Sequence, residues 1–302
     1  METVGIFGGS GFTGTALTQL LLQSGYRVII FSRQARETST PNLQYSAWQP
    51  DTEQIDNTAF CSLDHIINLS GAGIADKRWT PARKQLIIQS RTTSTSFLAR
   101  CLQSLPHRVR THINASASGY YGPSIGTHSF TEQDPPASDY LGQTCQAWEA
   151  SAQPIAAITR LVILRFGIVL GREGGMLGAF KPALALHLAP IMGGGQQWIG
   201  WIHLQDLCRM MLYALQHTEM NGAYNAAAPE PAQQKQLVYA VAKAACGWFI
   251  PAPAPAFVLK AMLGEMSGQL LQSNRMSAHK IQEAGFVFAF PDIDTAARDL
   301  YR

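Results

Sequence analysis

Three glycines spaced three residues apart, Gly8, Gly11 and Gly14, stand near the start of the chain and could cradle a phosphate. An apolar run at 4–7 precedes them, a helical pattern follows at 15–24, and a second apolar run occupies 28–31. Glycines let the backbone approach a pyrophosphate closely, and the amino end of a helix offers free N–H groups. This order predicts a dinucleotide site lined by Gly8, Ser10, Gly11, Phe12, Thr13 and Gly14.

The end of the second predicted strand indicates which dinucleotide fits. An NAD(H) site usually has Asp or Glu there to accept hydrogen bonds from the ribose 2′-hydroxyl. Here the strand ends in Ser32 and Arg33, and the first carboxylate is Glu37. A guanidinium suits a 2′-phosphate, and a serine hydroxyl can add a hydrogen bond. The residues favour NADP(H) over NAD(H); the alternative is an exposed arginine that holds no ligand.

Other predicted strands also end in turns where a cofactor could lie. The strand at 65–69 leads into small residues, which let the sheet pass close to a ring and a ribose, and the strand at 160–166 is followed by Gly167. Arg91, inside a helical pattern at 80–104, either reaches the pyrophosphate or is a solvated charge, and the sequence leaves both open. The cofactor site is predicted to continue through Leu69, Ser70, Gly71, Ala72, Arg91 and Phe166.

Strands and helices alternate along most of the chain. Further strand patterns occur at 43–48 and 111–117, and further helical patterns at 138–152 and 204–217. This alternation predicts an α/β fold, a Rossmann-type doubly wound parallel sheet with helices on both faces. Ligands of such sheets lie at the carboxyl ends of the strands, which is where the turns described above fall.

The composition excludes several classes of protein. Hydrophobic residues make up 46% of the 302 residues and charged residues 14%, which is unlike a disordered chain. The net charge of +3 is scattered, so we expect no nucleic-acid partner. Five widely spaced cysteines form no metal-ligand or disulfide pattern, and no apolar run is long enough to span a membrane. A cytoplasmic protein without a metal, acting on a small molecule, is expected.

Segments along nearly the whole chain resemble one family, the YfcH-like epimerase family group. This group belongs to the NAD(P)-dependent epimerase/dehydratase proteins, within the extended to atypical short-chain dehydrogenase/reductase superfamily. Besides the glycine turn, the matching segments are Asn68-Leu69-Ser70-Gly71, Arg78-Trp79, Ser90-Arg91, Gly119-Tyr120-Tyr121-Gly122, Trp148-Glu149, the run 164–171, Trp201-Ile202-His203 with Asp206, the run 225–231, Gly264-Glu265-Met266 and Glu283-Ala284-Gly285-Phe286.

The resemblance implies a two-part organisation. Residues 1–170, with 200–228 returning to them, would form an NADP-binding Rossmann domain. Residues 171–199 and 229–302 would form a small, mainly helical C-terminal domain on the substrate side. The stretch 171–201 has only Arg172, Glu173, Lys181 and His187 as ionisable groups, which argues mildly against a sugar-nucleotide substrate. Homodimers are frequent among relatives, so a homodimer is possible.

The catalytic residues are where the sequence departs from the superfamily. Relatives carry Ser or Thr after the fifth strand and Tyr-x-x-x-Lys on the next helix, where the lysine lowers the tyrosine pKa. Ser116, with Ser118 second, and Tyr140 match the first two roles, but Thr144 stands at the lysine position. Without a cation Tyr140 would be a poor base, although it could still donate a proton in a reduction.

Two functions of different class follow from these residues. The first is an NADP(H)-dependent oxidoreductase or epimerase-like enzyme acting on a small, weakly charged carbonyl or alcohol through Ser116 and Tyr140. The second, favoured by the missing lysine, is an NADPH-binding regulator or scaffold with little turnover.

Overall fold

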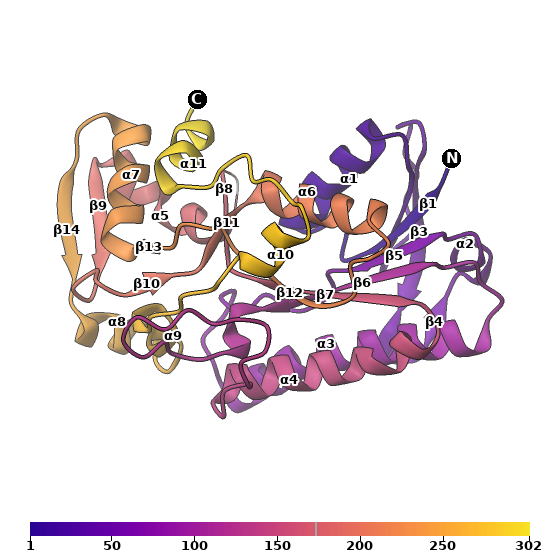
Figure 1. Cartoon of the computed structure of the whole chain (residues 1–302). Helices are drawn as coiled ribbons and strands as arrows, with labels where there is room; N and C mark the ends of the chain where they lie inside the picture. The colour runs from indigo at the N-terminus through magenta and orange to yellow at the C-terminus, as the bar shows by residue number, and fades with distance from the viewer. Residues whose placement is uncertain (173) are drawn as a thin grey trace.

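A large sheet forms the centre of one half of the protein (Figure 1). The structure is a computed structural model that describes residues 1–172 and 174–302. The strand order is β12-β7-β6-β5-β1-β2-β3-β4, and only the short edge strand β4 is antiparallel to its neighbour. The strands are β1 (Thr3–Phe7), β2 (Arg27–Ser32), β3 (Leu43–Gln49), β4 (Gln54–Ile55), β5 (His65–Asn68), β6 (Thr111–Ala117), β7 (Arg160–Phe166) and β12 (Gly222–Ala226).

The connection of these strands creates a switch point at the centre of the sheet. From β1 the chain builds β2 and β3 on one side, then crosses to build β5, β6 and β7 on the other. β1 is buried at every position, as expected for a strand covered on both faces. The predicted fold class, a doubly wound parallel sheet of the Rossmann type, is confirmed.

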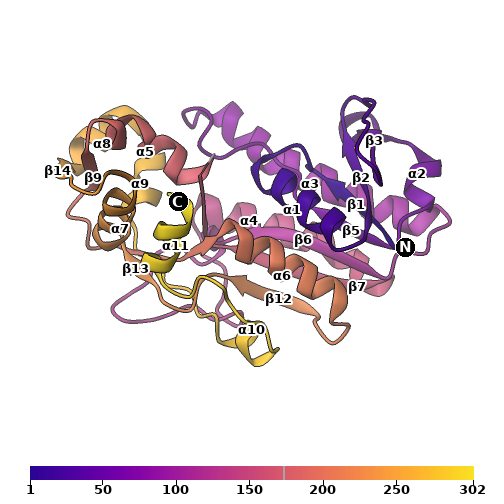
Figure 2. The same cartoon turned by 90° about the horizontal axis from the view of Figure 1, so that it is seen from above.

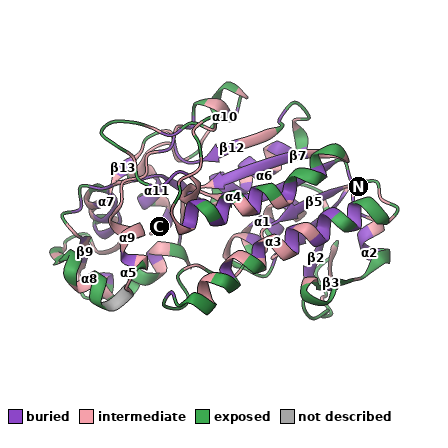
Figure 3. Cartoon of the chain, turned by 90° about the horizontal axis from the view of Figure 1, so that it is seen from below, coloured by how far each residue is buried: buried purple, intermediate pink, exposed green. Residues whose placement is uncertain are grey.

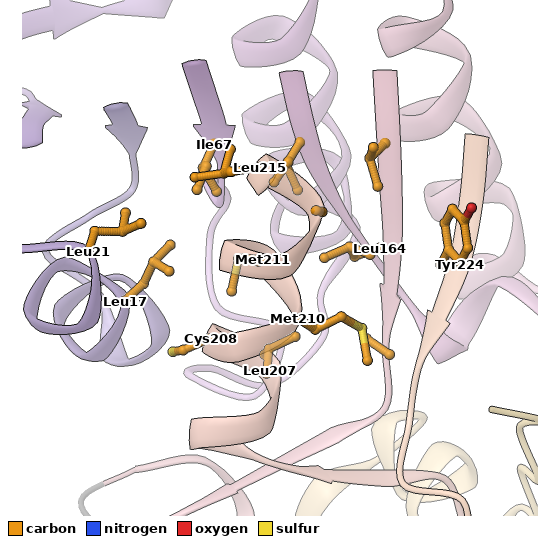
Figure 4. Packing of buried hydrophobic residues seen from close by; sticks show 14 of the residues in the cluster. Leu17, Leu21, Ile67, Leu164, Leu207, Cys208, Met210, Met211, Leu215 and Tyr224 are labelled. Atoms are coloured by element: carbon orange, nitrogen blue, oxygen red, sulfur yellow. The ribbon is translucent and has the colours of Figure 1, made fainter. Parts of the chain in front are cut away.

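Helices cover both faces of the sheet. α1 (Phe12–Gln23) and α6 (Leu204–Gln216) lie on one face, and α3 (Pro81–Ser104) and α4 (Tyr140–Ala152) on the other (Figure 2). Apolar residues recur every three to four positions along α6 and form one side of the helix. On this side Leu207, Met210 and Met211 pack against the strands, beside Leu17 of α1 (Figure 4). Shorter helical turns are η1 (Pro50–Thr52), α2 (Asn57–Cys61), η2 (Ser118–Tyr120) and η3 (Gln153–Ala157).

A second hydrophobic core lies beside the sheet and is built from α5 (Gly175–Ala185), α7 (Gln234–Cys246) and α11 (Ile293–Leu300). Together with the short strands around them we call these helices the small lobe (Figure 1). The C-terminal region is helical, as predicted, and its short strands were not predicted. The remaining elements are β8 (Ile168–Gly171), β9 (Leu188–Met192), β10 (Trp198–Ile199), β11 (Trp201–His203), β13 (Ala232–Gln233), β14 (Ile250–Ala254), α8 (Ala256–Leu263), α9 (Met266–Leu271) and α10 (His279–Glu283).

The proline-rich run of the small lobe forms a strand. β14 pairs in parallel with β9 although Pro251 and Pro253 lie within it. Because strand residues alternate in direction, Ile250, Ala252 and Ala254 lie on one edge, where their backbone groups can pair. The prolines, which lack an N–H group, fall on the opposite edge and cost no ladder hydrogen bond.

The C-terminal chain also returns to the sheet half. Ile281 of α10 and Phe286 pack into the core under α6. The buried carboxylate of Asp206, in the first turn of α6, accepts hydrogen bonds from the backbone N–H groups of Ala289 and Phe290. Asp206 therefore fastens this segment to the sheet half. The domain boundaries predicted from the sequence remain a proposal.

Buried residues concentrate in the sheet and on the inward sides of the helices (Figure 3). Among the helices of residues 1–172 and 174–302, none has both the length and the apolar character needed to cross a membrane. Glu173, one of the ionisable groups noted in the stretch 171–201, lies outside the described residues.

Candidate functional site

The carboxyl ends of five parallel strands meet at one edge of the sheet. The pairing register aligns Phe7 with Phe31 and with Asn68, and Ala117 with Phe166. The residues that follow these positions therefore share this edge. It gathers the predicted cofactor residues Gly8, Ser10, Gly11, Phe12, Thr13, Gly14, Ser32, Arg33, Leu69, Ser70, Gly71, Ala72 and Phe166.

The glycine turn is built by two glycines that tolerate no side chain. Gly8 has φ +84°, and a Cβ atom there would lie 2.8 Å from the backbone carbon of Leu69. A Cβ atom at Gly14 would lie 2.6 Å from the Cα of Gly9 and 2.7 Å from the carbonyl oxygen of Gly8. Both are too close for real atoms, so these two glycines are required by the turn itself.

Gly11 differs from the other two. It is the exposed N-cap of α1 with φ −79°, which any residue can adopt, and a Cβ atom there would make only ordinary contact, 3.4 Å from the Gly8 carbonyl oxygen. No side chain caps this end of α1, and its first turn contains no acidic residue. The turn thus presents unoccupied N–H donors and an open surface at Gly11, a combination suited to an anion.

The other residues of the turn divide between exposure and packing. Ser10 is exposed and Thr13 is half-buried. The ring of Phe12 lies against Gly171 and Gly174, where an added Cβ atom would clash at 2.3 and 2.7 Å. The Phe12 side chain therefore joins the turn to the beginning of the small lobe, and its backbone N–H stays in the first turn of α1.

Arg33 is exposed and pairs with no other residue in the described part of the chain. The Ser32 hydroxyl donates to the Gln34 carbonyl 2.6 Å away, which shapes the turn after β2. Arg36, also exposed, stacks over the ring of Tyr45 at 4.4 Å. Two guanidinium groups therefore lie after the end of β2, and neither has a carboxylate partner among the residues that the structure describes.

Hydrogen bonds hold the turn after β5 against α3. Asn68 donates to Thr95 Oγ1 and to Asn114 Oδ1, and its own Oδ1 accepts from the backbone and hydroxyl of Ser70. One turn earlier on α3, Ser90 Oγ accepts from the N–H of Ala72. Leu69 packs against the core under α1 and α6. This network fixes the 69–72 turn beside the glycine turn.

Arg91 is a buried residue, so the solvated-charge interpretation is wrong. The residue is 8% exposed, and its Nη1 donates to the carbonyls of Ala72 and Ile87, each at 3.0 Å. The guanidinium lies 5.0 Å from the centre of the Trp148 ring and against Gly71. Arg91 thus lies under the 69–72 turn, between α3 and α4.

Ser116 and Tyr140 belong to different hydrogen-bond networks. Ser116 is 2% exposed, and its hydroxyl donates to Glu149 Oε1 at 2.6 Å. Tyr140 begins α4, and its hydroxyl donates to the backbone carbonyl of Lys84 at 3.0 Å. No hydrogen bond within the described residues joins the two hydroxyls. Ser118, the second serine candidate, follows β6 at the edge of the sheet. It is half-buried, and is therefore more accessible than the buried Ser116.

The position that carries lysine in relatives of the superfamily is filled by a buried threonine. Thr144 is 2% exposed, and its hydroxyl donates to the Tyr140 carbonyl. Burial raises the pKa of Tyr140, because the phenolate loses hydration. Lys84 lies 4.9 Å from the centre of the Tyr140 ring and forms an ion pair with Glu265.

A buried ion pair lies beneath this edge of the sheet, and the sequence did not predict it. Arg165 of β7 binds Glu149 of α4 through two nitrogens, at 2.9 and 2.8 Å, and donates to the Tyr121 hydroxyl. Tyr121 in turn donates to Asn225 of β12. A charged residue inside an apolar run is the sequence signal that could have indicated this pair, because charged residues are seldom buried unless they are paired. The Tyr120 ring stacks on the Arg165 guanidinium at 3.5 Å, which places it at the edge beside Phe166.

Among the described residues no group of three or more His, Cys, Asp or Glu side chains could hold a metal ion.

Comparisons with known proteins agree over the whole chain. The model of the NAD dependent epimerase/dehydratase family matches residues 4–227, and a domain of unknown function, DUF1731, matches residues 254–300. Epimerase family protein YfhF of Bacillus subtilis (strain 168) is 35% identical over 308 residues, covering 98% of this chain and 97% of that protein. Epimerase family protein SSP1921 of Staphylococcus saprophyticus is 33% identical over 302 residues, covering 98% of each chain.

A solved structure is similar over the same length. The crystal structure of human epimerase family protein SDR39U1 (isoform2) with NADPH has a TM-score of 0.89 and 29% sequence identity, and the match covers 99% of both chains.

Proposed function

Because the chain belongs to the NAD dependent epimerase/dehydratase family, we propose that it binds NADP(H) and acts as an oxidoreductase or epimerase-like enzyme on a small, weakly charged carbonyl or alcohol. The observation that carries the proposal is Gly11. Neither its φ angle nor its packing requires glycine. We expect a methyl group there to hinder an anion that approaches the N–H groups in the first turn of α1. A ligand that lies directly on this turn accounts for the glycine.

The preference for NADP(H) rests on the end of β2. A 2′-phosphate would meet the unpaired Arg33, with Arg36 nearby, and no carboxylate stands there to bind a ribose 2′-hydroxyl. The human relative with a TM-score of 0.89 was crystallised with NADPH, which supports the same choice for this chain. Binding would be completed by the 69–72 turn, which the Asn68 network holds beside the glycine turn.

Tyr140 is the proposed proton donor. A bound NADPH would supply a hydride. In a carbonyl reduction the Tyr140 O–H bond breaks, and its proton passes to the substrate oxygen. Burial raises the pKa of Tyr140, so the phenol is protonated near neutral pH and ready to act as an acid. To do so it must release the Lys84 carbonyl, to which it donates in this structure.

Ser118 supports the reaction better than Ser116. The Ser116 hydroxyl proton is held by Glu149 in a buried position, whereas Ser118 opens η2 at the edge of the sheet. We keep Ser116 as a residue that orders the Glu149–Arg165 pair beneath the site, and assign contact with the substrate oxygen to Ser118.

A second function is favoured by the same observations about Tyr140 and Thr144. The Tyr140 hydroxyl is engaged by a backbone carbonyl, and a threonine occupies the lysine position. A protein that binds NADPH and changes its contacts with a partner would need no proton donor. This alternative is an NADPH-binding regulator or scaffold.

Turnover by a Tyr140→Phe variant separates the two functions. The purified protein is loaded with NADPH and screened against short aldehydes and ketones by following nicotinamide absorbance. If the protein is an enzyme, the parent protein oxidises NADPH in the presence of a carbonyl substrate. The Tyr140→Phe variant should not oxidise NADPH, although it should bind NADPH with unchanged affinity. Oxidation that persists at the same rate in Tyr140→Phe would reject Tyr140 as the acid. If no carbonyl is reduced but NADPH binds, the regulator or scaffold is favoured.

A further inference from the structure

Arg91 is a buried cation that has no anionic partner in the described part of the chain. Its residue is 8% exposed, and no carboxylate of the described chain lies within ion-pair distance of it. Arginine is rarely buried unless paired, because removing its charge from water is costly. The two backbone carbonyls that its Nη1 meets compensate this cost only in part. Within the described residues, therefore, this positive charge has no negative counterpart.

The Arg91 guanidinium faces α4, where its carbon lies 5.0 Å from the centre of the Trp148 ring. Arg91 folds back along α3 toward the carbonyl of Ile87, one turn nearer the helix start. α3 and α4 lie side by side (Figure 1). Lys84 meets Tyr140 at one level, and Arg91 meets Trp148 two turns further along the two helices. Thr144 lies between Tyr140 and Trp148 on the same side of α4, at a spacing of four residues. Because the Arg91 side chain folds back by one turn from the level of Trp148, we expect its charge to act near Thr144, the position where a lysine is absent.

We propose that Arg91 is the positioning residue that supplies, from α3, the positive charge which position 144 of α4 lacks, and that it stabilises the Tyr140 phenolate. The inference rests on the proposed function, in which Tyr140 gives its proton to the substrate oxygen. The phenolate left by that transfer is the anion that Arg91 faces. A cofactor hydride and the tyrosine proton together convert the carbonyl to an alcohol, and the negative charge stays on the Tyr140 oxygen.

The other two cations near Tyr140, Lys84 and Arg83, already have carboxylate partners. Lys84 forms an ion pair with Glu265, and Arg83 one with Asp76. Asp139, just before Tyr140, caps α4 by accepting from the Gly142 N–H. Of the three cations, only Arg91 has no carboxylate partner within the described residues. Burial is the main influence on the Tyr140 pKa and raises it, whereas the charge of Arg91 acts in the opposite direction.

Two nitrogens of Arg91 remain available to a ligand. Nε and Nη2 donate no hydrogen bond to the described chain, and neither is sealed from solvent. They lie beneath the 69–72 turn, since Gly71 contacts the guanidinium. We expect them to donate to a hydroxyl or phosphate oxygen of the cofactor, so that one side chain would couple cofactor binding to the charge on Tyr140.

The direct test measures the phenol at position 140. A 3,5-difluorotyrosine, whose phenol titrates near neutral pH, replaces Tyr140, and its 19F shift is followed against pH. Arg91→Met should raise the pKa by about one unit, a tenfold change in acidity, and Arg91→Lys should restore most of it. Arg100→Met, on the exposed side of the same helix, is the matched control and should leave the titration unchanged. An unchanged pKa in Arg91→Met, or a shift found only in Lys84→Met, would overturn the proposal.

A stability cycle covers the case in which Arg91→Met folds poorly. Thr144→Lys places a second cation opposite Arg91 and should lower Tm in the parent protein. In the Arg91→Met background the same substitution should lower Tm less, because the new ammonium then meets no like charge. Equal losses in both backgrounds would show that the two positions do not share a site. Failure of the parent protein to bind NADPH would remove the proposed function without changing either readout.

Discussion

Replacing Gly11 and Gly14 separately by alanine distinguishes a glycine kept for a ligand from one kept for the fold. At Gly11 the added methyl would lie 3.4 Å from the Gly8 carbonyl oxygen, which is ordinary contact. Alanine is a poorer N-cap than glycine by up to ~1 kcal/mol, and the lower entropy of the unfolded alanine chain offsets about 0.4–1 kcal/mol of that. We therefore expect Gly11→Ala to change stability by less than ~1 kcal/mol, equivalent to a few degrees in Tm.

Gly14→Ala provides the contrast. Its methyl would lie 2.6–2.7 Å from three backbone atoms of Gly8 and Gly9, which cannot move without opening the turn. Overpacking of this kind costs roughly 1–3 kcal/mol or more. Gly14→Ala should therefore unfold at a clearly lower temperature than Gly11→Ala.

Cofactor affinity should follow a different order from stability. In Gly11→Ala the methyl covers the open N–H donors of α1, so the Kd for NADPH should rise at least tenfold, a loss of about 1.4 kcal/mol. Thermal unfolding followed by circular dichroism gives the stability, and calorimetric titration with NADPH gives the affinity. A Gly11→Ala protein with parental Tm and parental NADPH affinity would refute the reasoning that a ligand lies on this turn.

Other predictions concern charge. Arg33→Asp should weaken NADPH binding more than tenfold and leave NADH binding unchanged or better; equal losses for both in calorimetry would contradict a 2′-phosphate contact. Glu149→Gln leaves Arg165 without its counter-ion and should cost about 3–5 kcal/mol in urea unfolding, and an unshifted midpoint would count against a buried pair. Burial lowers the pKa of His112 from 6.5 to about 4, so the unfolded chain takes up a proton first. Stability should be full above pH 6.5 and fall by up to about 3 kcal/mol toward pH 4, a loss that His112→Leu should abolish.

The sheet and the glycine turn could be predicted because both depend on residues that are close together in the sequence. The apolar runs that became β1, β2, β6 and β7 are short and bounded by turn residues, and the order of strand, glycines and helix specifies the first unit. The predicted family is confirmed by matches over nearly the whole chain. The small lobe was harder, because its short strands carry little periodicity: the apolar stretch 176–192 divides into α5 and β9 without a signal that separates them.

The contacts of the candidate site depend on residues far apart in the chain. Tyr121 and Asn225 are 104 residues apart, and Lys84 and Glu265 are 181 apart, so spacing gives no hint that they meet. Ser116 has the expected distance in sequence from Tyr140, yet its side chain points to Glu149 of α4. The burial of Arg91 likewise arises from the packing of α3 on α4, which a helical pattern alone does not reveal.

The measurement that tests the central claim most directly is a side-by-side calorimetric titration of the purified protein with NADPH and NADH. We predict saturable binding of NADPH, with NADH at least tenfold weaker because it lacks the phosphate that would meet Arg33. Absence of binding with both nucleotides would contradict the assignment of the glycine turn as a cofactor site. Equal affinity for the two would contradict the role given to Arg33.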